Sequence, residues 1–304
     1  MTDPADTPAP GANEDSVPVY PSPLTVTLPE GPPLPLICAS PHSGKRYPER
    51  MISALCVPLI DLKRTEDAFI DELLAPASQF GATVLAAYYA RGFVDLNRHA
   101  LELDPAMFED GSPRVCGQPG PRVQAGLGSL PRVGARGTPI YARKLSRAEG
   151  EARLRDVHDV YHRDLNARLE ALRSRHGEAF LIDWHSMPSV QPGRRRLPDV
   201  VLGDRFGSSC CSRLTSAVER AFRRLGYSVV RNAPYAGGYT TRRYGRPRQG
   251  LHALQVEVRR DLYLDELRVE KTSGFSRLAR DIADVLADVA TFIGTRGVTQ
   301  TAAE

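Results

Sequence analysis

Three polar residues that could do metal or acid–base chemistry follow a short apolar run in this sequence. The run covers residues 179–182, long enough for a buried strand, and the three residues are Asp183, His185 and Ser186. Such a strand would deliver them to its carboxyl edge, where open α/β sheets hold their ligands. The two-residue period of a strand places Asp183 and His185 on one face and Trp184 on the other. A histidine oriented by a carboxylate is a common metal ligand, and a buried histidine held by structural hydrogen bonds is the alternative.

Another histidine, His42, stands on a turn of small residues, Ser40 to Gly44, directly after an apolar run at 34–39 that predicts a strand. A histidine in this position is well placed to bind a ligand, although turns also expose histidines that bind nothing. His158 and His162 are four apart on an expected helix. Because the glutamate of the zinc motif H-E-x-x-H is missing between them, we interpret them as surface or packing residues.

Acidic residues that could complete a metal site lie in the segment from Asp61 to Ser78. Its apolar residues recur at intervals of three and four, which predicts a helix. Asp67 and Asp71 are four residues apart on this helix and would repel each other unless a cation or an arginine lies nearby. A solvated acidic helix face is the alternative interpretation.

The remaining pattern predicts an α/β protein. Further strands are expected at 83–89, 93–96, 199–202, 227–231 and 251–258, and helices at 146–175, 212–225 and 277–293, the first of these capped by Ser146. Strands that alternate with helices indicate a single domain with a mixed, mostly parallel central sheet flanked by helices. We expect this domain at residues 21–296, after a disordered leader at 1–20 and before a flexible tail at 297–304.

Composition narrows the class of protein. The 304 residues include 40 basic and 36 acidic ones, and the net charge of +4 does not indicate a protein that binds nucleic acid. No apolar run approaches the roughly 20 residues that span a membrane, and the amino-terminal segment does not resemble a signal peptide. The five cysteines form no C-x-x-C pair, which is typical of reduced thiols. We expect a cytoplasmic protein with no nucleic-acid or membrane partner; its oligomeric state is not indicated.

Six motifs occur in the order expected of N-formylglutamate amidohydrolases, and the chain resembles this family over about residues 35–270. The motifs are Pro41-His42-Ser43-Gly44, Asp95-Leu96-Asn97-Arg98, residues 126–132, Asp183-Trp184-His185-Ser186, Gly237-Gly238-Tyr239-Thr240 and residues 252–257. The resemblance implies an α/β fold similar to that of the zinc carboxypeptidases. It also implies a hydrolase that holds one zinc ion per chain, with a position left open for water.

The resemblance further implies the metal ligands His42, Asp67 and His185. The acidic ligand stays open between Asp67 and Glu66, because Lys45 stands at the third position after His42, where the zinc carboxypeptidases carry their glutamate.

Two catalytic roles are implied in the same way. Glu257, on a late strand, matches the glutamate that serves as general base, and its alternative role is a buried salt bridge to Arg259 or Arg98. Asp183 would orient a ligand or the attacking water.

The implied substrate is an N-acyl amino acid, typically the N-formyl derivative of glutamate. Such a dianion needs cationic partners, and arginine holds a carboxylate through two bonds. The expected substrate-binding residues are Asn97, Arg98, Tyr239, Arg246 and His252. Glycines around Tyr239 would allow that loop to close over the substrate.

Two other functions stay open. A carboxypeptidase-like metallopeptidase would use the same site on a longer peptide or N-acyl substrate, and a groove lined by the loop at 104–137, which is rich in glycine, proline and arginine, would favour it. A protein without catalytic activity would bind an anionic partner through its arginine-rich loops. This last function requires that the protein bind no zinc or that Glu257 lie out of position for catalysis.

Overall fold

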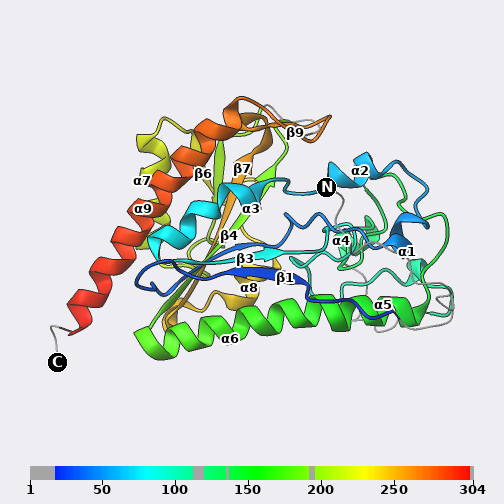
Figure 1. Cartoon of the computed structure of the whole chain (residues 1–304), viewed down its shortest axis with the longest axis horizontal. Helices are drawn as coiled ribbons and strands as arrows, with labels where there is room; N and C mark the ends of the chain where they lie inside the picture. Colours follow the sequence, from blue (N-terminus) through cyan, green and yellow to red (C-terminus); the bar gives the residue numbers. More distant parts are fainter. Residues whose placement is uncertain (1–17, 112–119, 135–136, 192–195, 302–304) are drawn as a thin grey trace, which may run out of the picture.

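The computed structural model describes residues 18–111, 120–134, 137–191 and 196–301. A seven-stranded sheet with the order β1-β3-β2-β4-β7-β5-β6 runs through the centre of the molecule (Figure 1). Its strands are β1 (Leu24–Thr27), β2 (Leu36–Ser40), β3 (Thr83–Ala87), β4 (Ala179–Met187), β5 (Val200–Gly203), β6 (Val229–Arg231) and β7 (Leu251–Arg259). A small hairpin of β8 (Leu264–Asp265) and β9 (Glu270–Lys271) lies apart from this sheet.

The four middle strands β3, β2, β4 and β7 are parallel. At the margins, β1 is antiparallel to β3, β5 is antiparallel to β7, and β6 is parallel to β5. The prediction of an α/β domain with a mixed, mostly parallel sheet is therefore confirmed. Because parallel strands end at the same edge, β2, β4 and β7 bring their carboxyl ends together, and the register places His185 beside Glu257.

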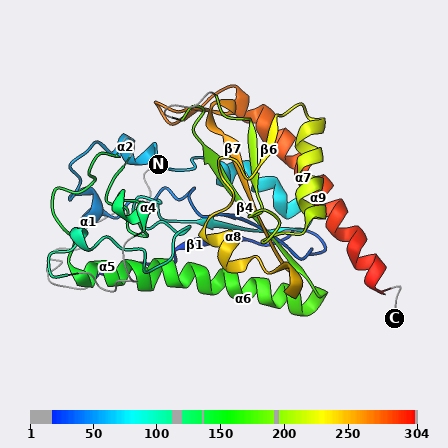
Figure 2. The same cartoon turned by 180° about the vertical axis from the view of Figure 1, so that it is seen from behind.

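Helices cover both faces of the sheet (Figures 1 and 2): α6 lies along one side, and α7 and α9 lie along the other. The helices are α1 (Glu49–Ile52), α2 (Leu59–Lys63), α3 (Ile70–Leu73), α4 (Pro121–Gln124), α5 (Arg147–Arg153), α6 (Asp159–His176), α7 (Ser212–Arg224), α8 (Tyr239–Tyr244) and α9 (Gly274–Thr301). Short 3₁₀ turns lie at η1 (Ala75–Phe80), η2 (Pro105–Met107), η5 (Pro247–Gln249) and η6 (Arg260–Leu262). No helix in the described part of the chain is long and apolar enough to cross a membrane.

The alternation expected for β4 is present in the core. Ile182 and Trp184 belong to the apolar cluster that includes residues of α7 and α9, whereas Leu181 belongs to the cluster that includes residues of α6. Asp183 and His185 follow the alternation of Leu181, so their side chains leave the strand opposite Trp184. The predicted separation of these polar residues from Trp184 is confirmed.

Two predicted elements are wrong. Residues 61–78 do not form one helix, because the chain breaks between α2 and α3, where Phe69 adopts a φ of 65°. The break allows the backbone N–H of Asp67 to donate to the carbonyl of His42 at 3.0 Å. Residues 93–96 form turns and not a strand: the N–H of Phe93 donates to Ala90 at 2.9 Å.

The long helix predicted from Ser146 is confirmed as α5, a π-helical turn η4 (Leu154–His158) and α6. The Ser146 hydroxyl accepts from the N–H of Glu149 at 3.2 Å and caps it. His158 and His162 are buried, and their Nε2 atoms lie 2.9 Å from the carbonyl oxygens of Arg98 and Leu96 respectively. They are packing residues that hold the turn after residue 95 against α6.

The structure describes only part of the predicted leader and of the predicted tail. Residues 1–17 of the predicted leader and residues 302–304 of the predicted tail lie outside the described residues. Tyr20, at the end of the predicted leader, packs edge-on against Phe93 with ring centroids 4.9 Å apart. Helix α9 continues to Thr301, past the predicted domain end at residue 296.

Candidate metal and active site

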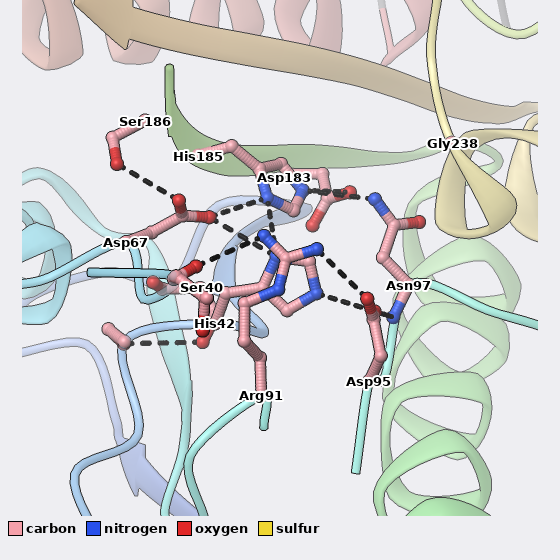
Figure 3. Close-up of polar contacts among 12 residues, drawn as sticks. Ser40, His42, Asp67, Arg91, Asp95, Asn97, Asp183, His185, Ser186 and Gly238 are labelled. Atoms are coloured by element: carbon pink, nitrogen blue, oxygen red, sulfur yellow. Dashed lines mark hydrogen bonds and ion pairs between the residues drawn. The ribbon is translucent and has the colours of Figure 1, made fainter. Parts of the chain in front are cut away.

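Two histidines and one carboxylate converge at the carboxyl edge of the sheet (Figure 3). His42 follows β2, His185 lies near the end of β4, and Asp67 comes from the break between α2 and α3. The Nδ1 atoms of the two histidines lie 3.2 Å apart. Asp67 Oδ2 lies 3.2 Å from Nδ1 of His42 and 3.0 Å from Nδ1 of His185. All three side chains are buried, and together they form a group that could hold a metal ion.

The hydrogen bonds of the histidines define which nitrogen could bind a metal. His42 Nε2 lies 2.7 Å from Asp95, and His185 Nε2 lies 2.9 Å from Asp183. A neutral imidazole that donates its Nε2 proton to a carboxylate keeps its lone pair on Nδ1. Both Nδ1 lone pairs then face each other and the Asp67 carboxylate. A cation bound by all three groups would remove the repulsion among these electron donors. Two imidazoles and one carboxylate are the donor set of many catalytic zinc sites.

The orientation of Asp67 is secured on the side away from the histidines. Its Oδ1 accepts hydrogen bonds from the Ser186 hydroxyl at 2.9 Å and from the guanidinium of Arg260 at 3.1 Å, which leaves Oδ2 for the histidines. Burial by itself would raise the pKa of Asp67, but when His185 and His42 are protonated in the absence of a metal ion, their hydrogen bonds and charges hold this pKa well below its usual range. Glu66 bonds the hydroxyl of Tyr47 instead. The structure thus places Asp67, and not Glu66, at the histidine pair.

Glu257 lies on the wall of the same cavity. It is buried, and its carboxylate accepts from the side-chain amide of Gln255 at 2.7 Å. Burial is the main cause that raises the pKa of Glu257 to about 7. A carboxyl group that ionises near neutral pH is suited to take up and return a proton. Arg259, one candidate partner for a structural salt bridge, pairs instead with aspartates at positions 199 and 261.

The cavity at this edge has a volume of about 590 Å³ and is rich in arginine. Its arginines are Arg64, Arg91, Arg98, Arg122 and Arg260. Arg64, Arg91 and Arg260 form ion pairs with aspartates at 2.6, 2.9 and 3.1 Å. Arg98 donates to carbonyl oxygens of the backbone, at 3.1 Å to Leu127 and at 2.9 Å to Asn97. Because carbonyls are neutral, these hydrogen bonds do not pair Arg98 with a carboxylate, although the charges of Asp95 and Glu102 lie near enough to favour its charged form.

Asn97 connects the histidine pair to the glycine-rich loop. Its Nδ2 lies 3.3 Å from Nε2 of His185, and its Oδ1 accepts from the N–H of Thr240 at 2.9 Å. A Cβ atom on Gly238 would lie 2.4 Å from the Asn97 amide, so only glycine allows this close approach. Asn97 therefore lines the cavity and also positions the loop that closes one of its sides.

The structure places three predicted substrate contacts away from this cavity, and we correct their assignment. Tyr239 points to the other side of α8, where its ring packs on His162 at 5.3 Å and lines a separate cavity of about 520 Å³. Arg246 lies 4.0 Å from Glu170, on α6. His252 stands near the start of β7, stacked on Phe180. These residues adjoin family motifs in sequence, but helix and strand geometry direct their side chains elsewhere.

Several cavity residues were missed by the sequence analysis. Asp95 was within a quoted motif, yet its role as the partner of His42 depends on a turn that the pattern misread as a strand. Arg260 directly follows β7, whose carboxyl end carries Glu257. This position after a predicted strand could have identified Arg260 as a cavity residue. Arg91 and Arg122 lie in segments without periodicity, where no pattern distinguishes a cavity arginine from a solvated one.

Known proteins of one family are similar to this chain in sequence and in structure. The model of the N-formylglutamate amidohydrolase family matches residues 34–264. The chain is 34% identical to the N-formylglutamate deformylases of Pseudomonas aeruginosa and Pseudomonas putida, over 77% of this chain and 83% of each relative. The crystal structure of N-formylglutamate amidohydrolase from Ralstonia eutropha JMP134 has a TM-score of 0.85 and 37% identity, and covers 90% of this chain and 99% of that one. The chain therefore belongs to the N-formylglutamate amidohydrolase family.

Proposed function

We propose that this protein is a zinc-dependent amidohydrolase that removes the formyl group from N-formyl-L-glutamate. The observation that carries the proposal is the convergence of His42, Asp67 and His185 on one wall of a cavity that also exposes Glu257. The names of the two bacterial relatives support the substrate, because both are N-formylglutamate deformylases. Bound by these three residues, zinc would act as a Lewis acid that acidifies water and polarises the formyl carbonyl.

The protein's own residues supply the proton transfers and the orientation. Glu257 takes a proton from water as the water oxygen adds to the formyl carbon. Glu257 then returns the proton to the amide nitrogen as the C–N bond breaks. The products are formate and the free amino acid. Asp95 and Asp183 hold the two imidazoles with their Nδ1 atoms towards Asp67, so the ligands need no rearrangement during the reaction.

Charge complementarity accounts for an acidic substrate. N-formylglutamate carries two carboxylates, and Arg98 presents a cation that is bonded only to neutral backbone carbonyls in its two hydrogen bonds. Arg122, on α4, lines the same cavity, and the two guanidinium groups are close enough for each to disfavour the charge of the other. An anion between them relieves this repulsion. We assign Arg98 and Arg122 to the substrate carboxylates.

The experiment that tests the proposal compares formate release from N-formyl-L-glutamate, N-formyl-L-glutamine and N-formyl-L-leucine. We expect kcat/KM to be highest for the glutamate derivative, because the other two lack the second carboxylate. Equal values for all three would remove the role of the arginines. No formate release, together with cleavage of longer peptides at their carboxyl ends, would replace the proposal with the carboxypeptidase alternative.

A further inference from the structure

The separate cavity that Tyr239 lines lies between α6 and α8 and has a volume of about 520 Å³ (Figure 2). Its other walls come from the end of η4 and from residues 99–100, which follow the substrate-binding motif in the chain. Among the described residues, the lining includes three histidines, two arginines and one aspartate. None of the described residues lines both this cavity and the catalytic one, so the proposed deformylase reaction leaves these polar groups unused.

Arg243, on α8, brings a positive charge to the separate cavity without a carboxylate partner. Its guanidinium donates to the hydroxyl of Tyr239 and lies 5.7 Å and 5.5 Å from the ring centroids of Tyr239 and Tyr244. It forms no ion pair with a described carboxylate, whereas Arg242 on the same helix lies 3.8 Å from Glu102. Because the two rings restrain the guanidinium, its remaining N–H groups keep a fixed orientation.

Two further donors of the lining lack a partner among the described residues. Nδ1 of His99 accepts from the N–H of Leu101 at 3.1 Å, so the neutral ring carries its proton on Nε2, which has no hydrogen-bond partner there. Arg163, on α6, forms no ion pair with a described carboxylate, although Asp159 precedes it by one helical turn. The cavity therefore combines two guanidinium groups and one imidazole N–H that can bind an acceptor.

The acidic residue of the described lining has a histidine beside it. Asp159 Oδ1 lies 3.3 Å from Nδ1 of His158, whose Nε2 lies 2.9 Å from the carbonyl oxygen of Arg98. When this ring is protonated, it compensates the charge of Asp159. Burial is the main cause that holds the pKa of His162 well below its usual value, and the charges of His158 and Arg243 act in the same direction. The two arginines thus leave an excess of positive charge in the cavity.

The two cavities share two backbone segments. Asn97 lines the catalytic cavity and His99 the separate one, and the same division separates Gly238 from Tyr239. The separate cavity therefore lies directly behind the segments that form one side of the catalytic cavity.

We propose that the separate cavity is a binding site for a small oxyanion with two negative charges, held by Arg243, Arg163 and Nε2 of His99. Phosphate groups and dicarboxylates share this chemistry, because their oxygens accept hydrogen bonds and a guanidinium can bind two of them at once. The volume of about 520 Å³ falls within the range of about 300–1,000 Å³ that is usual for cavities that bind small molecules. Binding at this site requires neither zinc nor the hydrolysis of an amide.

The test is a titration of the full chain, labelled with ¹³C at the histidine Cε1 atoms and followed by NMR. The chain has seven histidines, and the signal of His99 is the one missing from the His99→Gln variant. Inorganic phosphate and glutarate are added separately, with sodium chloride keeping the ionic strength constant. We expect at least one of these anions to shift the His99 signal with a Kd of about 1 mM or lower. A shift with phosphate alone identifies a phosphate group as the ligand, and a shift with glutarate alone identifies a dicarboxylate.

Variants test which residues hold the anion. Arg243→Gln and Arg163→Gln should each raise the Kd at least about tenfold, because each removes charged hydrogen bonds. The control Arg246→Gln, whose arginine lies 4.0 Å from Glu170, should change the Kd less than about twofold. Arg163 is exposed, so its variant decides if Arg243→Gln fails to fold.

Two results would overturn the proposal. One is a His99 signal that neither anion shifts, including the case in which only the signals of His42 and His185 move, because the anion then binds in the catalytic cavity. The other is a Kd that stays unchanged in the folded arginine variants.

Discussion

Replacement of Asp95 by asparagine tests the part of the site that the sequence did not reveal. Asp95 accepts from His42 Nε2 at 2.7 Å, from the N–H of Asn97 at 2.9 Å and from Arg91 at 2.9 Å. Asparagine keeps the size of the side chain and one acceptor oxygen. It removes the negative charge that favours the Nδ1 lone pair of His42, and it turns an N–H group towards Arg91.

The expected magnitude follows from the role of such carboxylates. Loss of the partner of a metal-binding histidine typically weakens metal affinity 10- to 100-fold, which corresponds to about 1.4–2.7 kcal/mol. The short contact and the complete burial of both groups favour the upper half of this range. We therefore expect Asp95→Asn to raise the Kd for zinc by about 30- to 100-fold.

The assay is competition for zinc between the purified protein and a chromophoric chelator, so it does not depend on catalysis. The matched control is Asp71→Asn, because Asp71 lies on α3 and forms a half-exposed ion pair with Lys45 at 3.2 Å. The control should bind zinc as the wild type does, since a surface ion pair contributes about 0–1 kcal/mol. Wild-type zinc affinity in Asp95→Asn would refute the assignment of His42 as a ligand oriented by this carboxylate.

Three further substitutions test the remaining roles. Glu257→Gln should bind zinc normally and lower kcat by about 10²- to 10⁴-fold, measured by formate release, because the amide cannot take a proton; an unchanged kcat would remove Glu257 from the mechanism. His185→Ala should lower the zinc content measured by elemental analysis, and full occupancy would show that another residue is the ligand. Arg98→Ala should raise KM for N-formyl-L-glutamate about tenfold or more, whereas Arg246→Ala, outside the cavity, should leave it unchanged; equal effects would reject the assignment of Arg98.

The sequence predicted the strands that carry the site better than the segments between them. β4 and β7 are buried along their whole length, and the period of two in β4 places Asp183 and His185 on one side. The segment around Asp67 was misread as helical, because its apolar spacing is helical while its actual conformation depends on a backbone hydrogen bond to His42, 25 residues earlier. Local pattern contains no information about such a contact.

The substrate residues show the same limit. Asn97 and Arg98, which were predicted from a family motif, line the cavity, whereas Tyr239 and His252 do not, because a motif does not tell which way each of its side chains points. Arg122 lies on the short helix α4, in a segment whose composition predicts only an irregular loop. Its position at the cavity results from tertiary packing.

The central claim is that one zinc ion, held by His42, Asp67 and His185, is required for hydrolysis. Its most direct test is the metal content of the purified protein, measured together with formate release from N-formyl-L-glutamate before chelation, after chelation and after addition of zinc. The account predicts about one zinc per chain, loss of activity with the chelator and recovery with zinc. Formate release at full rate from protein that contains no metal would contradict it.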